Sequence, residues 1–122
     1  MKRLTQTLAF CLLTVFTAVA QKNYVSEVWV SDLGNGKYKN PVLYADYSDP
    51  DACRVGDDFY MISTTMHLMP GAPVMKSKDL VNWEIVGYVF DRLTDNPGYD
   101  LKEGTVYGWG QWASSIRYHS GK

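Results

Sequence analysis

Residues 40–65 read NPVLYADYSDPDACRVGDDFYMISTT and carry the strongest local signals in the chain. Two apolar runs, residues 52–55 and 59–64, flank a Gly-Asp-Asp sequence at residues 56–58. Glycine supplies positive φ without strain, and aspartate is common in turns. Two short apolar runs around such a turn predict a β-hairpin.

Strand-like segments continue beyond the hairpin and are separated by glycine or proline. No segment shows sustained helical periodicity, so the chain is predicted to be all-β. The four predicted strands cover residues 52–55, 59–64, 72–77 and 84–90. Four antiparallel strands form one blade of a β-propeller, whose apolar face needs neighbouring blades to cover it.

The segment after these strands is predicted to be a long loop followed by a new strand. Residues 91–110 are polar and rich in glycine, as in an inter-blade loop. Residues 112–118 alternate like a strand, and Ser120-Gly121 marks a turn after them. Asp49 stands just before the first strand, where Pro50 is expected to hold its backbone extended.

Several motifs in register resemble glycoside hydrolase family 43 over residues 40–122. The motifs are Asn40-Pro41-Val42-Leu43, Asp49-Pro50-Asp51, the segment RVGDDFY at 54–60, Pro70-Gly71, the segment SKDLVNW at 77–83, Trp112-Ala113 and Ile116-Arg117-Tyr118-His119. The resemblance implies a five-bladed β-propeller, of which this chain supplies the first blade and the start of the second. It also implies an enzyme that cuts arabinose- and xylose-containing plant polysaccharides with inversion.

The resemblance assigns site roles to four residues. Asp49 matches the general base of the family, although by local sequence alone it is an aspartate that caps a turn. Trp112 and Ala113 match a pair that lines the sugar subsite. Met66 stands where xylosidase-type members place an aromatic residue, so β-xylosidase and α-L-arabinofuranosidase activities both stay open.

The remaining acidic residues of this region have structural interpretations. Asp46 is interpreted as a loop acid, and Asp51 as the start of a strand. Asp57 and Asp58 are expected to be solvated in the hairpin turn.

Three further residues are interpreted as structural. Trp83 is expected to pack against the adjacent blade, and Cys53 to be a small buried apolar residue. His67 is interpreted as a polar loop residue and not as a ligand.

The amino terminus has the pattern of a secretory signal peptide. Lys2 and Arg3 precede an apolar run at residues 8–16, and Ala18-Val19-Ala20 predicts cleavage before Gln21. The apolar run is shorter than the roughly 20 residues of a spanning helix. We therefore expect a periplasmic or secreted protein with no stable membrane insertion after cleavage.

Residues 21–39 are predicted to be an amino-terminal extension before the propeller part at 40–122. Residues 25–31 alternate like a strand, and residues 34–36 read Gly-Asn-Gly, a turn signal. No chemistry is assigned to this extension.

Charge and motifs exclude several function classes. The formal net charge is −1, which gives no electrostatic basis for binding nucleic acid. The motifs of zinc proteases, nucleotide-binding loops and dinucleotide folds are missing, so no metal or cofactor is assigned to this chain. The resemblance implies that complete members often hold a calcium ion or a water near the propeller axis, on residues beyond Lys122.

The expected partner is a plant polysaccharide or oligosaccharide. Three interpretations of the protein's function stay open. The first is an exported glycosidase with Asp49 as base. The second is a non-catalytic sugar-binding propeller, and the third a fructan-cleaving relative. One blade cannot close a ring, so we expect an amino-terminal piece of a longer protein that neither folds stably nor hydrolyses glycosides alone.

Overall fold

The computed structural model of the chain describes residues 25–122. The predicted signal peptide at residues 1–20 lies outside this part of the chain and stays a prediction. Within residues 25–122, none of the helical structure has the length and apolar character needed to cross a membrane.

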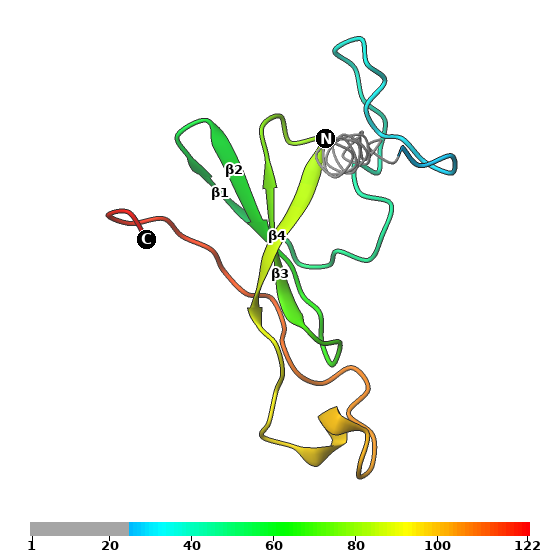
Figure 1. Ribbon diagram of the computed structural model, residues 1–122, viewed down its shortest axis with the longest axis vertical. Helices are drawn as coiled ribbons and strands as arrows, with labels where there is room; N and C mark the ends of the chain where they lie inside the picture. Colours follow the sequence, from blue (N-terminus) through cyan, green and yellow to red (C-terminus); the bar gives the residue numbers. More distant parts are fainter. Residues whose placement is uncertain (1–24) are drawn as a thin grey trace, which may run out of the picture.

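Four antiparallel strands form a single sheet in the order in which they occur along the chain (Figure 1). They are β1 (Asp51–Val55), β2 (Asp58–Ile62), β3 (Gly71–Ser77) and β4 (Trp83–Phe90). All four predicted strands are confirmed, with ends that differ by one or two residues. The sheet has the meander topology of a propeller blade.

The β1–β2 hairpin is tighter than predicted. Val55 pairs with Asp58, which leaves a two-residue turn in which Gly56 has φ of 61°. Asp57 is solvated as predicted, with a side chain that is 94% exposed. The prediction was wrong for Asp58, which begins β2 instead of lying in the turn.

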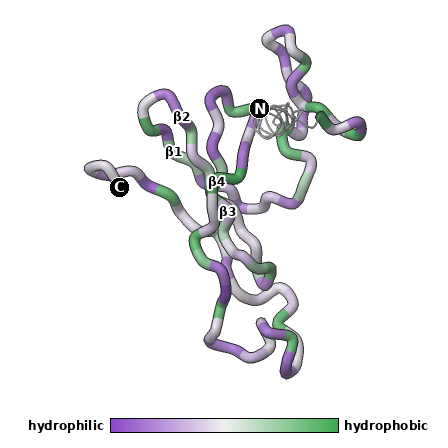
Figure 2. The backbone as a smooth tube through the Cα atoms, in the orientation of Figure 1, coloured by the Kyte–Doolittle hydropathy of each residue, from purple (hydrophilic) through white to green (hydrophobic). Residues whose placement is uncertain are grey.

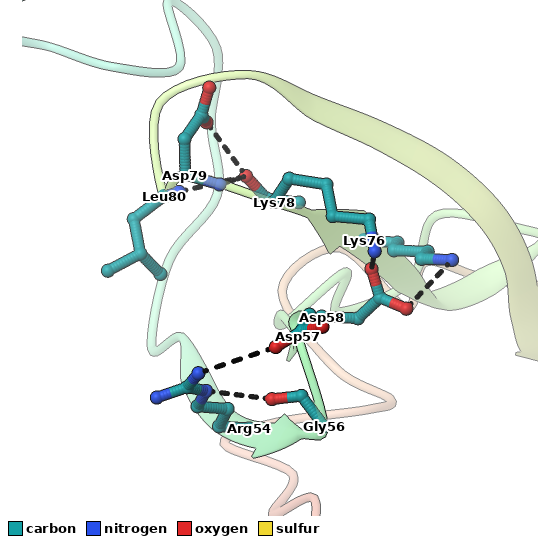
Figure 3. Close-up of polar contacts among 9 residues, drawn as sticks. Arg54, Gly56, Asp57, Asp58, Lys76, Lys78, Asp79 and Leu80 are labelled. Carbon is teal, nitrogen blue, oxygen red and sulfur yellow. Dashed lines mark hydrogen bonds and ion pairs between the residues drawn. The ribbon is translucent and has the colours of Figure 1, made fainter.

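Asp58 enters the sheet because the turn is only two residues long, and it lies beside two lysines, one on β3 and one directly after it. Lys76 Nζ lies 3.2 Å from one carboxylate oxygen of Asp58, and Lys78 Nζ lies 2.6 Å from the other (Figure 3). The ammonium group of Lys78, and then that of Lys76, lowers the pKa of Asp58. This aspartate therefore joins β2 to the end of β3.

The described core is small and centres on β3, which is buried along most of its length. Its apolar members come from β2, β3 and the long loop, and are Met61, Ile62, Ala72, Met75 and Val106. β4 leaves Ile85, Val86 and Val89 exposed. Apolar stretches therefore appear along the outer strands in Figure 2 as well as in the centre.

Two residues with predicted packing roles lie on the outer strands. Trp83 is half-buried at the start of β4, and its indole N–H donates to the carbonyl of Leu80 at 3.0 Å. Cys53 is a free cysteine on β1 and is half-buried, so the prediction of a fully buried side chain was wrong. The reason is that β1 is an edge strand with one neighbour.

Two predicted strands do not form. Residues 25–31 and 112–118 are irregular, because a strand needs a neighbour that completes its hydrogen-bond ladder. The predicted Gly-Asn-Gly turn is confirmed, and an isolated bridge between Asp32 and Tyr38 closes it. The long loop after β4 is also confirmed, and it contains the short 3₁₀ helix η2 (Pro97–Asp100).

Candidate active site

The site candidates gather at one end of the sheet. β1 begins there at Asp51, which pairs with Ile62, the last residue of β2. Asp49 precedes β1 and Thr64 follows β2, so the hairpin register places these two residues side by side. β4 ends at Phe90 opposite Gly71, and the long loop starts from this same end (Figure 1).

Asp49 has a left-handed backbone, with φ of 47°. The prediction of an extended conformation was therefore wrong. The residue before it is held firmly: the carbonyl of Ser48 accepts from Thr64 N at 3.1 Å and from the Ser63 hydroxyl at 2.7 Å. These bonds hold the chain where Asp49 must adopt the strained φ, a type of strain that clusters at functional sites.

Thr64 links Asp49 to the predicted sugar-lining pair. Its hydroxyl donates to Asp49 Oδ2 at 2.9 Å and accepts from the backbone N–H of Ala113 at 2.8 Å. Thr64 is only 4% exposed, so both bonds are shielded from water, whereas Asp49 itself is exposed. The Asp49 carboxylate is thus oriented from one side and open on the other.

Gln111 fastens the returning chain to the end of β2. Its backbone exchanges two hydrogen bonds with Met66, at 2.9 and 3.0 Å. Its side-chain carbonyl accepts from Thr65 N at 2.7 Å, and its amide donates to the Ser114 hydroxyl at 2.7 Å. These contacts bring Met66, Trp112 and Ala113 together around Thr64.

Gly110 allows this close approach. Its φ is 107°, and a Cβ atom built there would lie 2.2 Å from the carbonyl oxygen of Met66. Any side chain at this position would push the two segments apart. Trp112, two residues further on, is 53% exposed and directly precedes Ala113, whose N–H bonds Thr64.

Sequence reasoning missed Thr64 and Gln111. The available signal was the run Ser63-Thr64-Thr65 at the end of an apolar strand, because buried hydroxyls require hydrogen-bond partners. Gln111 gave no local signal for its link to β2, since its partners Thr65 and Met66 are 45 or more residues away along the chain.

The carboxylate of Asp51, unlike that of Asp49, is engaged with the carboxyl-terminal segment. It accepts from the backbone N–H of Ile116 at 3.0 Å and forms an ion pair with Arg117. The bond from Ile116 and then that from Arg117 lower the pKa of Asp51. This aspartate holds the carboxyl-terminal segment against β1, in agreement with its predicted structural role.

Asp46 and His67 lie beside the site in different settings. Asp46 is an exposed loop residue, as predicted. The Nδ1 atom of His67 accepts from Gly108 N at 3.2 Å, so this histidine connects two loops. Within residues 25–122, no three acidic, histidine or cysteine side chains are grouped so that they could hold a metal ion. The calcium ion implied for the complete propeller stays a prediction.

The chain belongs to glycosyl hydrolases family 43, whose sequence profile matches residues 38–122. It is 47% identical over 90 residues to a β-xylosidase of Formosa agariphila, covering 74% of this chain and 15% of the relative. It is 38% identical over 96 residues to a non-reducing end α-L-arabinofuranosidase of Bacteroides ovatus, covering 77% of this chain and 18% of the relative.

Solved structures of the family contain the same fold. A bifunctional GH43–CE protein of Bacteroides eggerthii matches 66% of this chain and 11% of its own, with 55% identity and a TM-score of 0.63. A GH43 enzyme engineered for both endo-xylanase and exo-arabinofuranosidase activity matches 67% of this chain and 16% of its own, with 46% identity and a TM-score of 0.62. The four-stranded sheet is thus one blade of the propeller of this family.

Proposed function

We propose that the protein containing this sequence is an exported glycoside hydrolase that cleaves arabinose- or xylose-containing plant glycans with inversion, using Asp49 as general base. One observation carries the proposal. The Asp49 carboxylate is exposed, and Thr64 ties it to the segment that contains the exposed Trp112. An exposed carboxylate that is tied to a segment with an exposed tryptophan suits the binding of a sugar ring and an attacking water.

In this mechanism, Asp49 takes a proton from water as the water oxygen bonds to the anomeric carbon. A carboxylic acid on the other side protonates the leaving oxygen, and the two groups stand roughly 6.5–9.5 Å apart. Glu84 cannot be that acid, because it lies opposite Lys76 in the β3–β4 register, near the end of the sheet that is remote from Asp49. The acid is therefore proposed to lie on another blade.

The substrate class is inferred from the relatives. The chain spans about 15–18% of the length of the two curated relatives described above, one a β-xylosidase and the other an α-L-arabinofuranosidase. Met66 supplies a flexible apolar contact at the sugar subsite, and this feature favours neither sugar. We therefore include both xylose and arabinose in the proposal.

The direct test is Asp49→Asn in the complete protein. The amide keeps the size of the side chain but cannot accept the proton, so turnover of aryl arabinofuranoside and xyloside should fall at least ~100-fold. Substrate binding should change little. Asp57→Asn is the matched control, because Asp57 is a solvated turn aspartate, and it should leave turnover unchanged.

The stereochemistry of the product and the activity of Asp49→Asn together distinguish the inverting enzyme from a non-catalytic propeller. Proton NMR of the first product should show the anomer opposite to that of the substrate. A protein that binds oligosaccharides without any turnover would instead support the non-catalytic sugar-binding propeller. Near-normal turnover in Asp49→Asn would exclude Asp49 as the base.

Export is proposed from the signal-peptide pattern at residues 1–20. The precursor should be cleaved between Ala20 and Gln21 and leave the cytoplasm. Amino-terminal sequencing of protein from the periplasm or medium tests this. Intact Met1 on cytoplasmic protein would contradict it.

Residues 21–122 alone are proposed to be inactive, because the general acid is assigned to another blade. The exposed apolar residues of β4 should also make the isolated blade prone to aggregation. Heating of the purified segment should show no sharp transition, and no aryl glycoside should be released. Asp49-dependent turnover by this segment would show that it contains the acid.

A further inference from the structure

The loop between β4 and Gln111 holds an aromatic side chain out into solvent. Tyr107 is 81% exposed, yet it directly follows Val106, a core residue that is only 6% exposed. The carbonyl of Val106 also accepts from Trp109 N at 2.9 Å, which closes a turn around Tyr107. The tyrosine is therefore exposed on an anchored turn.

A second set of contacts braces this turn against the loop that follows β2. Gly108 N donates to His67 Nδ1 at 3.2 Å, and the rings of His67 and Tyr107 lie 5.0 Å apart at an angle of 50°. The neighbouring bridge between Met66 and Gln111 joins the same two loops. Three contacts thus set the position of the Tyr107 ring relative to the end of β2.

Tyr107 and His67 line a groove that starts beside the general-base candidate. Ser48 and Thr64, which hold Asp49, form one part of its wall, and Tyr107 and His67 form another. The groove has a volume of about 660 Å³. Asp46 adds a carboxylate and Leu68 an apolar side chain that is 63% exposed.

The groove combines the groups that recognise a sugar. An aromatic ring packs on the apolar face of a pyranose or furanose, and carboxylate and hydroxyl oxygens accept hydrogen bonds from its hydroxyls. The volume is in the range of ordinary small-molecule sites. The side chains at both ends are held by contacts within the chain, so little ordering is needed on binding.

We infer that this groove binds a second sugar residue of the glycan, next to the residue whose bond is cleaved, and that Tyr107 stacks on that second ring. This inference rests on the proposed function, because it takes Asp49 as the group nearest the cleaved bond. Tyr107 is then a specificity-determining residue that distinguishes an oligosaccharide from a substrate with a single sugar.

The test compares two substrate lengths in the complete protein. Tyr107→Ala should lower kcat/KM for arabinoxylo-oligosaccharides about threefold to tenfold, the range expected for one aromatic contact. Hydrolysis of 4-nitrophenyl α-L-arabinofuranoside and β-D-xyloside, which have one sugar each, should fall less, because a nitrophenyl group takes the place of the second sugar. Tyr107→Phe keeps the ring and should restore the oligosaccharide value.

The matched control is Tyr38→Ala. Tyr38 is also an exposed tyrosine, at 56%, but it belongs to the amino-terminal turn and does not line the groove. Its removal should affect neither substrate. Equal losses on both substrates in Tyr107→Ala, or no loss on either, would overturn the inference.

A binding measurement separates this inference from the proposed function. Calorimetry with xylotetraose and with an arabinoxylo-oligosaccharide in the Asp49→Asn background needs no turnover. Tyr107→Ala should weaken binding there by the same threefold to tenfold. If the parent protein proves inactive but Tyr107→Ala still weakens binding, the proposed function is wrong and sugar binding in the groove is supported. Unchanged binding in an active parent would refute the groove alone.

Discussion

The two ends of the sheet each hold an aspartate beside a buried hydroxyl residue, but they treat the carboxylate differently. At the β3–β4 turn, Asp79 accepts from the Ser77 hydroxyl, from the backbone N–H groups of Val81 and Asn82, and from the Asn82 amide. At the other end, Thr64 is the hydrogen-bond donor recorded for Asp49 within residues 25–122.

This difference in bonding separates a structural carboxylate from one that is available for chemistry. The bonds from Asn82 and Val81 lower the pKa of Asp79 to about 2, and they leave little capacity for a further partner. Asp49 keeps most of its acceptor sites open to solvent. Hydrogen bonds to Ser48 keep the backbone of Asp49 in its strained left-handed conformation. Such strain is expected at a functional residue, where stability is lower in exchange for activity.

Apart from Asp49→Asn, Thr64→Val is expected to have the largest effect on kcat among substitutions at the two ends of the sheet. The change keeps the shape of the side chain but removes its bonds to Asp49 and Ala113, so kcat should fall about tenfold, the scale of one hydrogen bond to a charged group. KM for an aryl glycoside should change much less. Thr64→Ser keeps the hydroxyl and should recover most of the loss.

Ser77→Ala is the control for Thr64→Val, because Ser77 is equally buried but lies at the opposite end of the sheet. It should lower the melting temperature and leave kcat unchanged. If Thr64→Val lowered only the melting temperature, Thr64 would be a structural residue and not a positioning residue.

A smaller effect is expected for Asp79→Ala, on stability instead of turnover. The variant should lose about 1 kcal/mol in the free energy of unfolding at pH 7, the scale of a lost turn-capping side chain. Because the folded-state pKa of Asp79 is depressed, its contribution is present above the ordinary value of 3.8 and disappears as the pH falls toward about 2. Urea unfolding of the parent protein and of Asp79→Ala at pH 7, 4 and 3 should show a difference in the free energy of unfolding that becomes smaller toward acid. A difference that grew toward acid would contradict this account.

The smallest effect is expected for Asp49→Asn on stability. Asparagine tolerates the left-handed region at least as well as aspartate, and its side-chain oxygen can still accept from Thr64. The free energy of unfolding should therefore change by less than about 0.5 kcal/mol, the usual range for an exposed position. Thermal unfolding of the complete protein checks this. A large loss would mean that Asp49 serves the fold and resembles Asp79.

Local sequence was enough to predict the blade. The Gly-Asp turn and the four apolar runs depend on neighbours within a few residues, and all of them form. The motifs that resemble the family are local in the same way, so the position of the Asp49 candidate could be predicted from them. In the structure this carboxylate is exposed at the end of the sheet.

The hydrogen bonds that orient this carboxylate depend on the tertiary structure. The bonds from Thr64 to Ala113 and from Thr65 to Gln111 join residues 49 and 46 positions apart, and nothing local specifies them. The same holds for two wrong predictions: Asp58 pairs with Val55 as the first residue of β2, and residues 112–118 are irregular without a ladder partner. Turn and strand preferences are local energies, whereas the partner of a polar group depends on where the chain returns.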